Sequence, residues 1–185
     1  MKKQWPMLLW LLNQLRTSMR SCTLHFKKRW LNALNLQPSN MHIRNAQPSD
    51  IDNIVGLAKE MVTDTPFSSV IKDKIEKILQ VPHALSLVAE HEQDGLVGFF
   101  CGILDRQFFT GQLRAIDLAL FVDEKHRGSS AAIKLVKTFE NWAKQKGATQ
   151  TWLGQSVGKE IEKTKEFYER LGYQMMGVNT MKELH

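Results

Sequence analysis

A short polar loop near the middle of the sequence has the residue types of an anion-binding site. An apolar run ending at Val122 leads into this loop, and an amphipathic helix is predicted to begin at about Ser129. The first N–H groups of a helix have no intrahelical partner, and the helix dipole makes that end positive. The residues from Ser129 to Ala132 are small, so a bulky anion could approach the backbone. The pattern therefore predicts a phosphate or diphosphate site.

One carboxylate stands within the apolar strand that precedes this loop. Asp117 is charged, and burial of a charge is unfavourable unless the group has a partner or a function. Strand alternation predicts that Asp117 shares a face with Ala119 and Phe121. One interpretation is a structural ion pair with a nearby arginine, either Arg114 or Arg106.

The elements that would position these residues follow from hydrophobic periodicity and turn residues. Short turns favour antiparallel neighbours, whereas a helix between two strands implies a parallel pair. The fold class is therefore mixed α/β, with a central, mostly antiparallel sheet of six to seven strands, helices on both faces and one parallel strand-helix-strand unit. The predicted strands cover about 42–46, 85–90, 96–104, 115–122, 149–153, 173–176 and 179–184, and the helices about 51–60, 68–80, 129–146 and 159–171.

The order of elements over roughly residues 42–184 resembles the GNAT superfamily of acyl-CoA-dependent N-acetyltransferases. The family signature Arg/Gln-x-x-Gly-x-Gly/Ala matches Arg127 to Ala132, except that Ser130 replaces the central glycine. Position 130 is predicted in the first helical turn, where φ is negative and serine fits. A second match, Phe167-Tyr-Glu-Arg-Leu-Gly-Tyr173, is similar to the family's Phe-Tyr-x-x-Leu-Gly-Phe/Tyr. Ile161 departs from an asparagine that the family often has seven residues before the tyrosine.

The resemblance implies acetyl-CoA as the cosubstrate and direct attack of a primary amine on its thioester in a ternary complex. The acceptor would be a small molecule, a protein lysine or an N-terminus. Tyr168 matches the family's general acid for the departing thiolate, and Asp117 lies where many relatives hold a glutamate base. The diphosphate would bind the backbone of Arg127, Gly128, Ser129, Ser130, Ala131 and Ala132, and the pantetheine arm would pair with that of Leu120, Phe121 and Val122.

Two other interpretations stay open. A catalytically silent relative could bind acyl-CoA, or merely keep the fold, and act as an interaction module; Ser130 and Ile161 favour it. In the other, the N-terminal arm is the functional part and tethers the domain to a membrane or a nucleic acid.

The positive charge of the chain is concentrated in that arm. Residues 1–40 hold seven basic and no acidic residues, whereas the remaining 145 hold 18 basic and 19 acidic ones. We expect 1–40 to be a separate extension and 41–185 to be the acetyltransferase domain. Nucleic-acid or membrane contact is expected only through 1–40, whose apolar run Trp5–Leu12 is too short to span a bilayer. An organelle transit segment and an extension without a fold of its own are the alternatives.

The cysteines and histidines have no spacing typical of a metal or redox site. Cys22 and Cys101 are far apart, and the six histidines show no paired pattern. We therefore expect free thiols, no metal site and a cytoplasmic location. The sequence leaves open whether the protein is a monomer or a homodimer.

Overall fold

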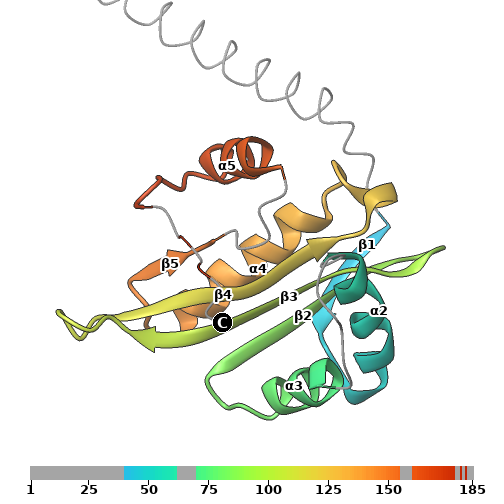
Figure 1. Cartoon of the computed structure of the whole chain (residues 1–185), viewed down its shortest axis with the longest axis horizontal. Coiled ribbons are helices and arrows are strands. Elements are labelled where there is room, and N and C mark those ends of the chain that lie inside the picture. The colour runs from blue at the N-terminus through green and yellow to red at the C-terminus, as the bar shows by residue number, and fades with distance from the viewer. Residues whose placement is uncertain (1–39, 62–69, 155–159, 178–179, 181, 183–185) are drawn as a thin grey trace, which may run out of the picture. The chain divides into compact units, whose positions relative to one another are not determined.

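The computed structural model of the chain describes residues 40–61, 70–154, 160–177, 180 and 182 (Figure 1). They belong to one compact unit, Asn40–His185. The predictions for the N-terminal arm, Cys22 included, lie outside the described residues. Within them, no helix is long and apolar enough to cross a membrane. Cys101 is a buried free thiol, as expected.

The described strands form one sheet in sequence order. The first four are antiparallel neighbours, and the fifth is parallel to the fourth, which confirms the mixed α/β fold with one parallel unit. The strands are β1 (Met41–Asn45), β2 (Ala84–His91), β3 (Gly95–Arg106), β4 (Leu113–Val122) and β5 (Gln150–Trp152).

The prediction of six to seven strands is wrong for the described part of the chain, which has five. Residues 173–176 follow the last helix without forming a strand, and Met175 and Met176 are 60% and 74% exposed. An extended segment becomes a strand only when a neighbouring edge satisfies its backbone groups. Most of the second predicted arm, 179–184, lies outside the described residues.

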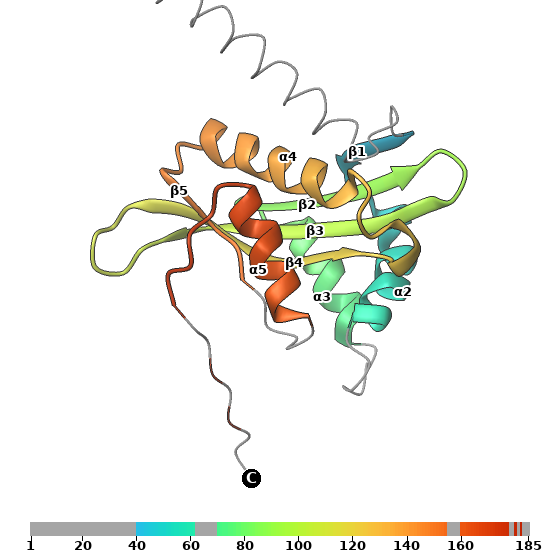
Figure 2. The same ribbon diagram turned by 90° about the horizontal axis from the view of Figure 1, so that it is seen from above.

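Helices cover both faces of the sheet, as predicted (Figure 2). Helix α4 (Ala131–Gln145) packs on one face, and α2 (Ile51–Met61) and α3 (Val70–Leu79) lie on the other. Helix α5 (Ile161–Arg170) follows β5. Two short 3-10 turns, η1 (Pro48–Asp50) and η2 (Glu124–His126), precede α2 and α4.

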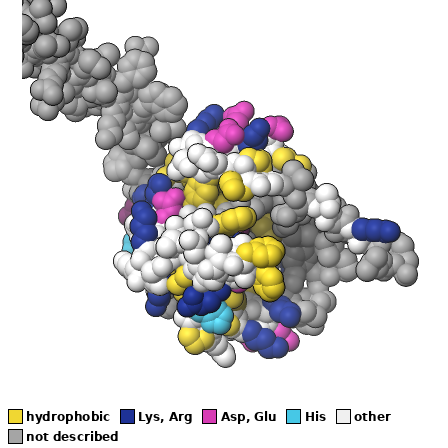
Figure 3. All heavy atoms as spheres, turned by 90° about the vertical axis from the view of Figure 1, so that its left-hand side faces the viewer, with side chains coloured by type: hydrophobic (Ala, Val, Ile, Leu, Met, Phe, Trp, Pro, Cys, Tyr) yellow, Lys and Arg dark blue, Asp and Glu magenta, His cyan; other side chains and the backbone are white. Residues whose placement is uncertain are grey.

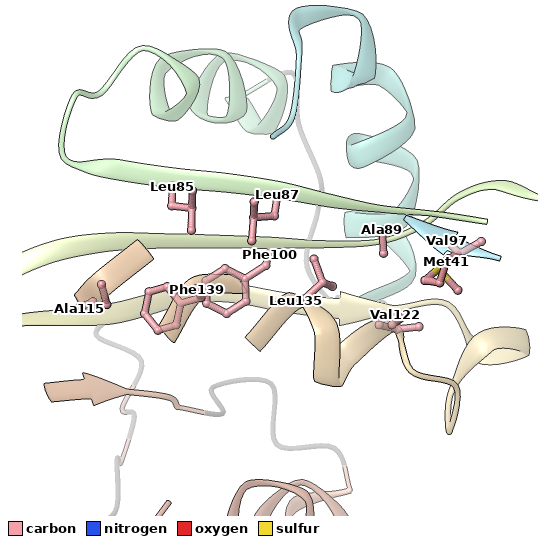
Figure 4. Close-up of a cluster of buried hydrophobic side chains, with 12 residues drawn as sticks. Met41, Leu85, Leu87, Ala89, Val97, Phe100, Ala115, Val122, Leu135 and Phe139 are labelled. Atoms are coloured by element: carbon pink, nitrogen blue, oxygen red, sulfur yellow. The ribbon is translucent and has the colours of Figure 1, made fainter. Parts of the chain in front are cut away.

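The core beneath α4 is centred on an aromatic pair (Figure 4). Phe100 of β3 and Phe139 of α4 are fully buried, with ring centroids 4.6 Å apart. Gly102 leaves the room for them, because a Cβ there would lie 2.8 Å from Cε2 of Phe139. This packing holds α4 against β3, and the same core includes Val122 at the end of β4 with Ala131 and Leu135 at the start of α4.

A β-bulge in β4 changes the face on which Asp117 lies. The β3 residues Cys101 and Gly102 pair with Ala119 and Asp117, so Leu118 between them has no opposite residue. A bulge resets the alternation of side chains along its strand. Asp117 therefore lies on the α4 face with Gly102, whereas Ala119 packs on the α2 face. The prediction that Asp117 shares a face with residues 119 and 121 is wrong.

Candidate active site

The loop between η2 and α4 has the backbone conformation that its sequence predicts. Ser130 has φ −76° and is only 5% exposed, so the residue that departs from the family glycine adopts a conformation open to serine. Gly128 has φ +82°, with nothing within 4 Å of an added Cβ. Glycine at 128 is therefore required by the backbone conformation and not by lack of space.

Three backbone amides in the predicted diphosphate loop already have partners inside the chain. Arg127 donates to the carbonyl of Glu124 at 3.3 Å, and Ser129 to that of His126 at 3.1 Å. The Ala131 amide donates to the Ser129 hydroxyl oxygen at 3.2 Å. The Ala131 contact is with a side chain, which could rotate away from an incoming anion.

Three other amides remain for an external acceptor. In the described part of the chain, no group accepts a hydrogen bond from the amides of Gly128, Ala132 and Ile133. Unpaired amides at a helix N-terminus suit a phosphate group. Ile133 was missed by the sequence analysis, although the third residue of any helix has an amide without an intrahelical partner.

The side chain of Arg127 connects the end of β4 with the start of α5. Its Nε donates to the carbonyl of Val122 at 3.4 Å, and its Nη1 lies 3.6 Å from Oε2 of Glu160. The Arg127 side chain is 49% exposed, so it remains accessible to an anion.

Strands β4 and β5 separate beside Asp117. The two strands pair only where Arg114–Ile116 lies opposite Gln150–Trp152. Beyond that point, the Gly154 amide donates to Oδ1 of Asp117 at 2.9 Å. The acceptor is thus a side chain, and not a backbone carbonyl of β4 as in a strand pair. Among the described residues, no strand pairs with the outer edge of β4 from Leu118 to Val122. This edge is where the pantetheine arm was predicted.

Burial raises the pKa of Asp117 to about 6, although backbone hydrogen bonds oppose the shift. The ion-pair interpretation of this carboxylate is wrong. Arg114 pairs with Asp105 at 2.7 Å, and Arg106 donates to the carbonyl of Gly111 at 3.0 Å. A half-buried carboxylate with a raised pKa at a strand opening is typical of a functional group.

Tyr168 of α5 lies across the same opening. Its hydroxyl donates to the Gly154 carbonyl at 3.3 Å, a long contact that is easily exchanged for another. Burial, together with the negative charge of Asp117, raises the pKa of Tyr168, so the phenol keeps its proton. Gly154 therefore contacts both predicted catalytic residues, one through its N–H and one through its C=O. The sequence did not reveal Gly154.

The second tyrosine of the chain lies beside the first. The rings of Tyr173 and Tyr168 have centroids 6.0 Å apart, and the Tyr173 hydroxyl lies 3.1 Å from Oγ1 of Thr151. Burial raises the pKa of Tyr173 to about 12. Both phenols are thus neutral hydrogen-bonding groups near neutral pH.

Large apolar side chains are exposed on the elements that form this site. Figure 3 shows hydrophobic side chains gathered on the side where α5, β5 and the β3–β4 turn lie. Leu118 is 51% exposed, Trp152 39% and Ile161 55%. The guanidinium carbon of Arg114 lies 4.9 Å from the centre of the Trp152 ring. Apolar walls with a few polar groups are common in small-molecule sites.

Comparisons with known proteins identify the family. Residues 52–173 match the model of the acetyltransferase (GNAT) family, and the chain belongs to that family. Among curated protein sequences, no relative matches this chain.

Solved structures share the fold at low sequence identity. The aminoglycoside N-acetyltransferase AAC(6')-Iy, bound to CoA-S-monomethyl-acetylneamine, is 21% identical to this chain with a TM-score of 0.66. The match covers 78% of this chain and 98% of the AAC(6')-Iy chain. Glucosamine-6-phosphate N-acetyltransferase from Arabidopsis thaliana is 20% identical with a TM-score of 0.65, covering 78% and 99%. Ribosomal-protein-alanine N-acetyltransferase from Brucella melitensis is 18% identical with a TM-score of 0.61, covering 78% and 99%.

Proposed function

We propose that this protein transfers an acetyl group from acetyl-CoA to a primary amine by direct attack in a ternary complex. Membership of the GNAT family supports acetyl transfer as the reaction class. The observation that carries the proposal is the placement of the Asp117 carboxylate and the Tyr168 hydroxyl on the two backbone groups of Gly154. This pair lies where β4 and β5 separate.

The chain has groups that fit both halves of the donor. The unpaired amides of Gly128, Ala132 and Ile133 and the half-exposed Arg127 guanidinium would hold the diphosphate. The unpaired edge of β4 beyond Asp117 would hydrogen-bond the pantetheine amides as an added strand does. The loop is therefore proposed for the role that its sequence predicts, with fewer free amides than the sequence alone indicates.

The proposed roles in acetyl transfer follow from the protonation states of Asp117 and Tyr168. Acetyl-CoA supplies a thioester carbonyl, at which a C–N bond forms as the C–S bond breaks. Asp117, with a pKa of about 6, is mostly ionised at neutral pH and takes the proton that the attacking amine loses. Tyr168 keeps its proton and donates it, or a hydrogen bond, to the sulfur that gains negative charge.

The acceptor is a primary amine of either a small molecule or a peptide. The names of structurally similar acetyltransferases include an aminoglycoside, a sugar phosphate and a ribosomal-protein alanine as acceptors. The exposed apolar residues Leu118 and Trp152 lie on the two strands that separate at Asp117, and they favour an acceptor with an apolar part.

Replacement of Tyr168 by phenylalanine tests the acid. We expect turnover to fall by roughly 10- to 10,000-fold with acetyl-CoA binding unchanged, because only the phenolic oxygen is lost. Thiol release over a panel of amines and calorimetry with acetyl-CoA would measure the two quantities. Tyr173→Phe is the matched control, since it removes a neighbouring hydroxyl, and we expect a much smaller effect. Equal rates for wild type and Tyr168→Phe, with chemistry rate-limiting, would reject the assignment.

The same measurements separate the enzyme from a silent binding module. Ser130 no longer favours the module, because its φ of −76° is ordinary for serine. Ile161 remains the departure in its favour. Acetyl-CoA binding by the wild-type chain, with no thiol release for any amine tested, would support the module in place of the enzyme.

A further inference from the structure

Two histidines and an aspartate converge beside the diphosphate loop, His126 coming from a segment distant in the sequence from His91 and Asp94. His91 ends β2, Asp94 lies in the β2–β3 turn, and His126 lies in η2. The three potential ligand atoms are all within 4.8 Å of one another. Oδ2 of Asp94 lies 2.8 Å from Nδ1 of His91 and 3.1 Å from Nε2 of His126.

The His91 nitrogen lacks a hydrogen bond. Its Nδ1 atom is buried, and despite its closeness to Asp94 it has no hydrogen-bond partner among the described residues. A buried nitrogen without a partner is unfavourable, and one such atom in a folded protein calls for an explanation. An ion shared with Asp94 would satisfy it.

His126 is oriented as metal-binding histidines usually are. Its other ring nitrogen, Nδ1, lies 2.7 Å from Oδ1 of Asp123. Asp123 also accepts a hydrogen bond from the His126 amide at 2.8 Å, so the carboxylate is fixed relative to the ring. A carboxylate behind a histidine fixes the tautomer that presents the opposite nitrogen to a metal ion. Here that nitrogen is Nε2, which points toward Asp94.

We propose that His91, Asp94 and His126 bind a divalent transition-metal ion such as Zn²⁺. Two imidazoles and a carboxylate favour zinc and its neighbours over magnesium or calcium. Ligand atoms 2.8 and 3.1 Å apart subtend about 90° at an ion about 2.1 Å from each, which transition-metal coordination allows. The ion would join the β2–β3 turn to η2, immediately before Arg127. The sequence predicted no metal site because residues 91 and 126 meet only through the folded sheet.

Metal binding by the untagged full-length chain tests this site. After treatment with EDTA and its removal, we expect calorimetry to show one Zn²⁺ bound with micromolar or tighter affinity. His91→Gln, Asp94→Asn and His126→Gln should each weaken the affinity by more than a hundredfold. Asp123→Asn should weaken it by only roughly 10- to 100-fold, because it acts through His126.

A matched histidine and a stability measurement control for misfolding. His83→Gln changes an exposed histidine outside the cluster and should leave zinc affinity unchanged. Zinc should raise the Tm of the wild type and of His83→Gln but not that of Asp94→Asn. No binding to the wild type, or equal affinity in all variants, would show that the three groups form only a hydrogen-bonded cluster. Either result leaves the acetyl-transfer proposal untouched, since no step of it uses the ion.

Discussion

At the scale of single residues, Asp117 combines a functional advantage with a thermodynamic disadvantage. The carboxylate lies within a mostly apolar strand, and burial raises its pKa to about 6 from an ordinary value of 3.8. A pKa near the working pH suits a general base, because the group is ionised yet still basic. The same burial penalises the ionised form in the folded state, so folding opposes the ionisation that catalysis requires.

Asp117→Asn should therefore stabilise the protein at neutral pH while inactivating it. The unfolded carboxyl ionises first, so the wild type loses stability as pH rises from about 4 to about 6. Asparagine does not ionise and can still accept the Gly154 hydrogen bond. We expect the variant to exceed the wild type in free energy of unfolding by about 1–3 kcal/mol above pH 6, and by almost nothing below pH 4. Urea unfolding at pH 4 and pH 7.5 measures the difference.

The same variant should also lose the pH dependence of its activity. Wild-type kcat/KM should rise with pH through about 6 as Asp117 loses its proton, and this rise should be absent in Asp117→Asn. A variant that is neither more stable nor less active would mean that Asp117 is exposed to water and uninvolved in catalysis.

At the scale of elements, the sequence predicts what depends on local pattern. The four helices and the first five strands were predicted within a few residues, because each has its own period of apolar residues. The bulge at Leu118 could not be predicted, since it exists only in the register between β3 and β4. The role of Gly154 could not be predicted for the same reason, because its two hydrogen bonds join elements that are distant in the sequence. The hairpin over 173–184 was predicted from its pattern, yet residues 173–176 have no strand partner among the described residues.

Two glycines in different elements should respond oppositely to alanine. Gly102→Ala would place a Cβ 2.8 Å from Phe139 and 2.9 Å from Phe100, and should destabilise the fold by about 1–3 kcal/mol. Gly56→Ala lies on the exposed side of α2 with nothing within 4 Å, and should stabilise it by about 1 kcal/mol. Chemical denaturation measures both. Similar stabilities for the two variants would contradict the close packing beneath α4.

At the scale of the whole molecule, the positive net charge and the residues proposed for catalysis lie in different parts of the chain. The residues proposed for catalysis and acetyl-CoA binding lie between positions 117 and 168, and the family match covers 52–173. The basic excess lies in residues 1–40, while the remaining residues are nearly neutral. We therefore expect any attraction to an anionic surface to come from the arm, where each basic residue near a membrane would contribute about 1 kcal/mol.

Deletion of residues 1–39 should separate these two properties. We expect kcat/KM for acetyl transfer to stay within about twofold of the full chain, because the deletion removes no residue proposed to contact substrate. Binding to vesicles containing phosphatidylserine should be lost, whereas the full chain should bind at low salt and be released as salt screens its charge. Vesicle sedimentation at two salt concentrations and a thiol-release assay measure the two properties. Unchanged vesicle binding by the shortened chain would place the anionic-surface contact in the domain itself, and lost turnover would mean that the arm takes part in the active site.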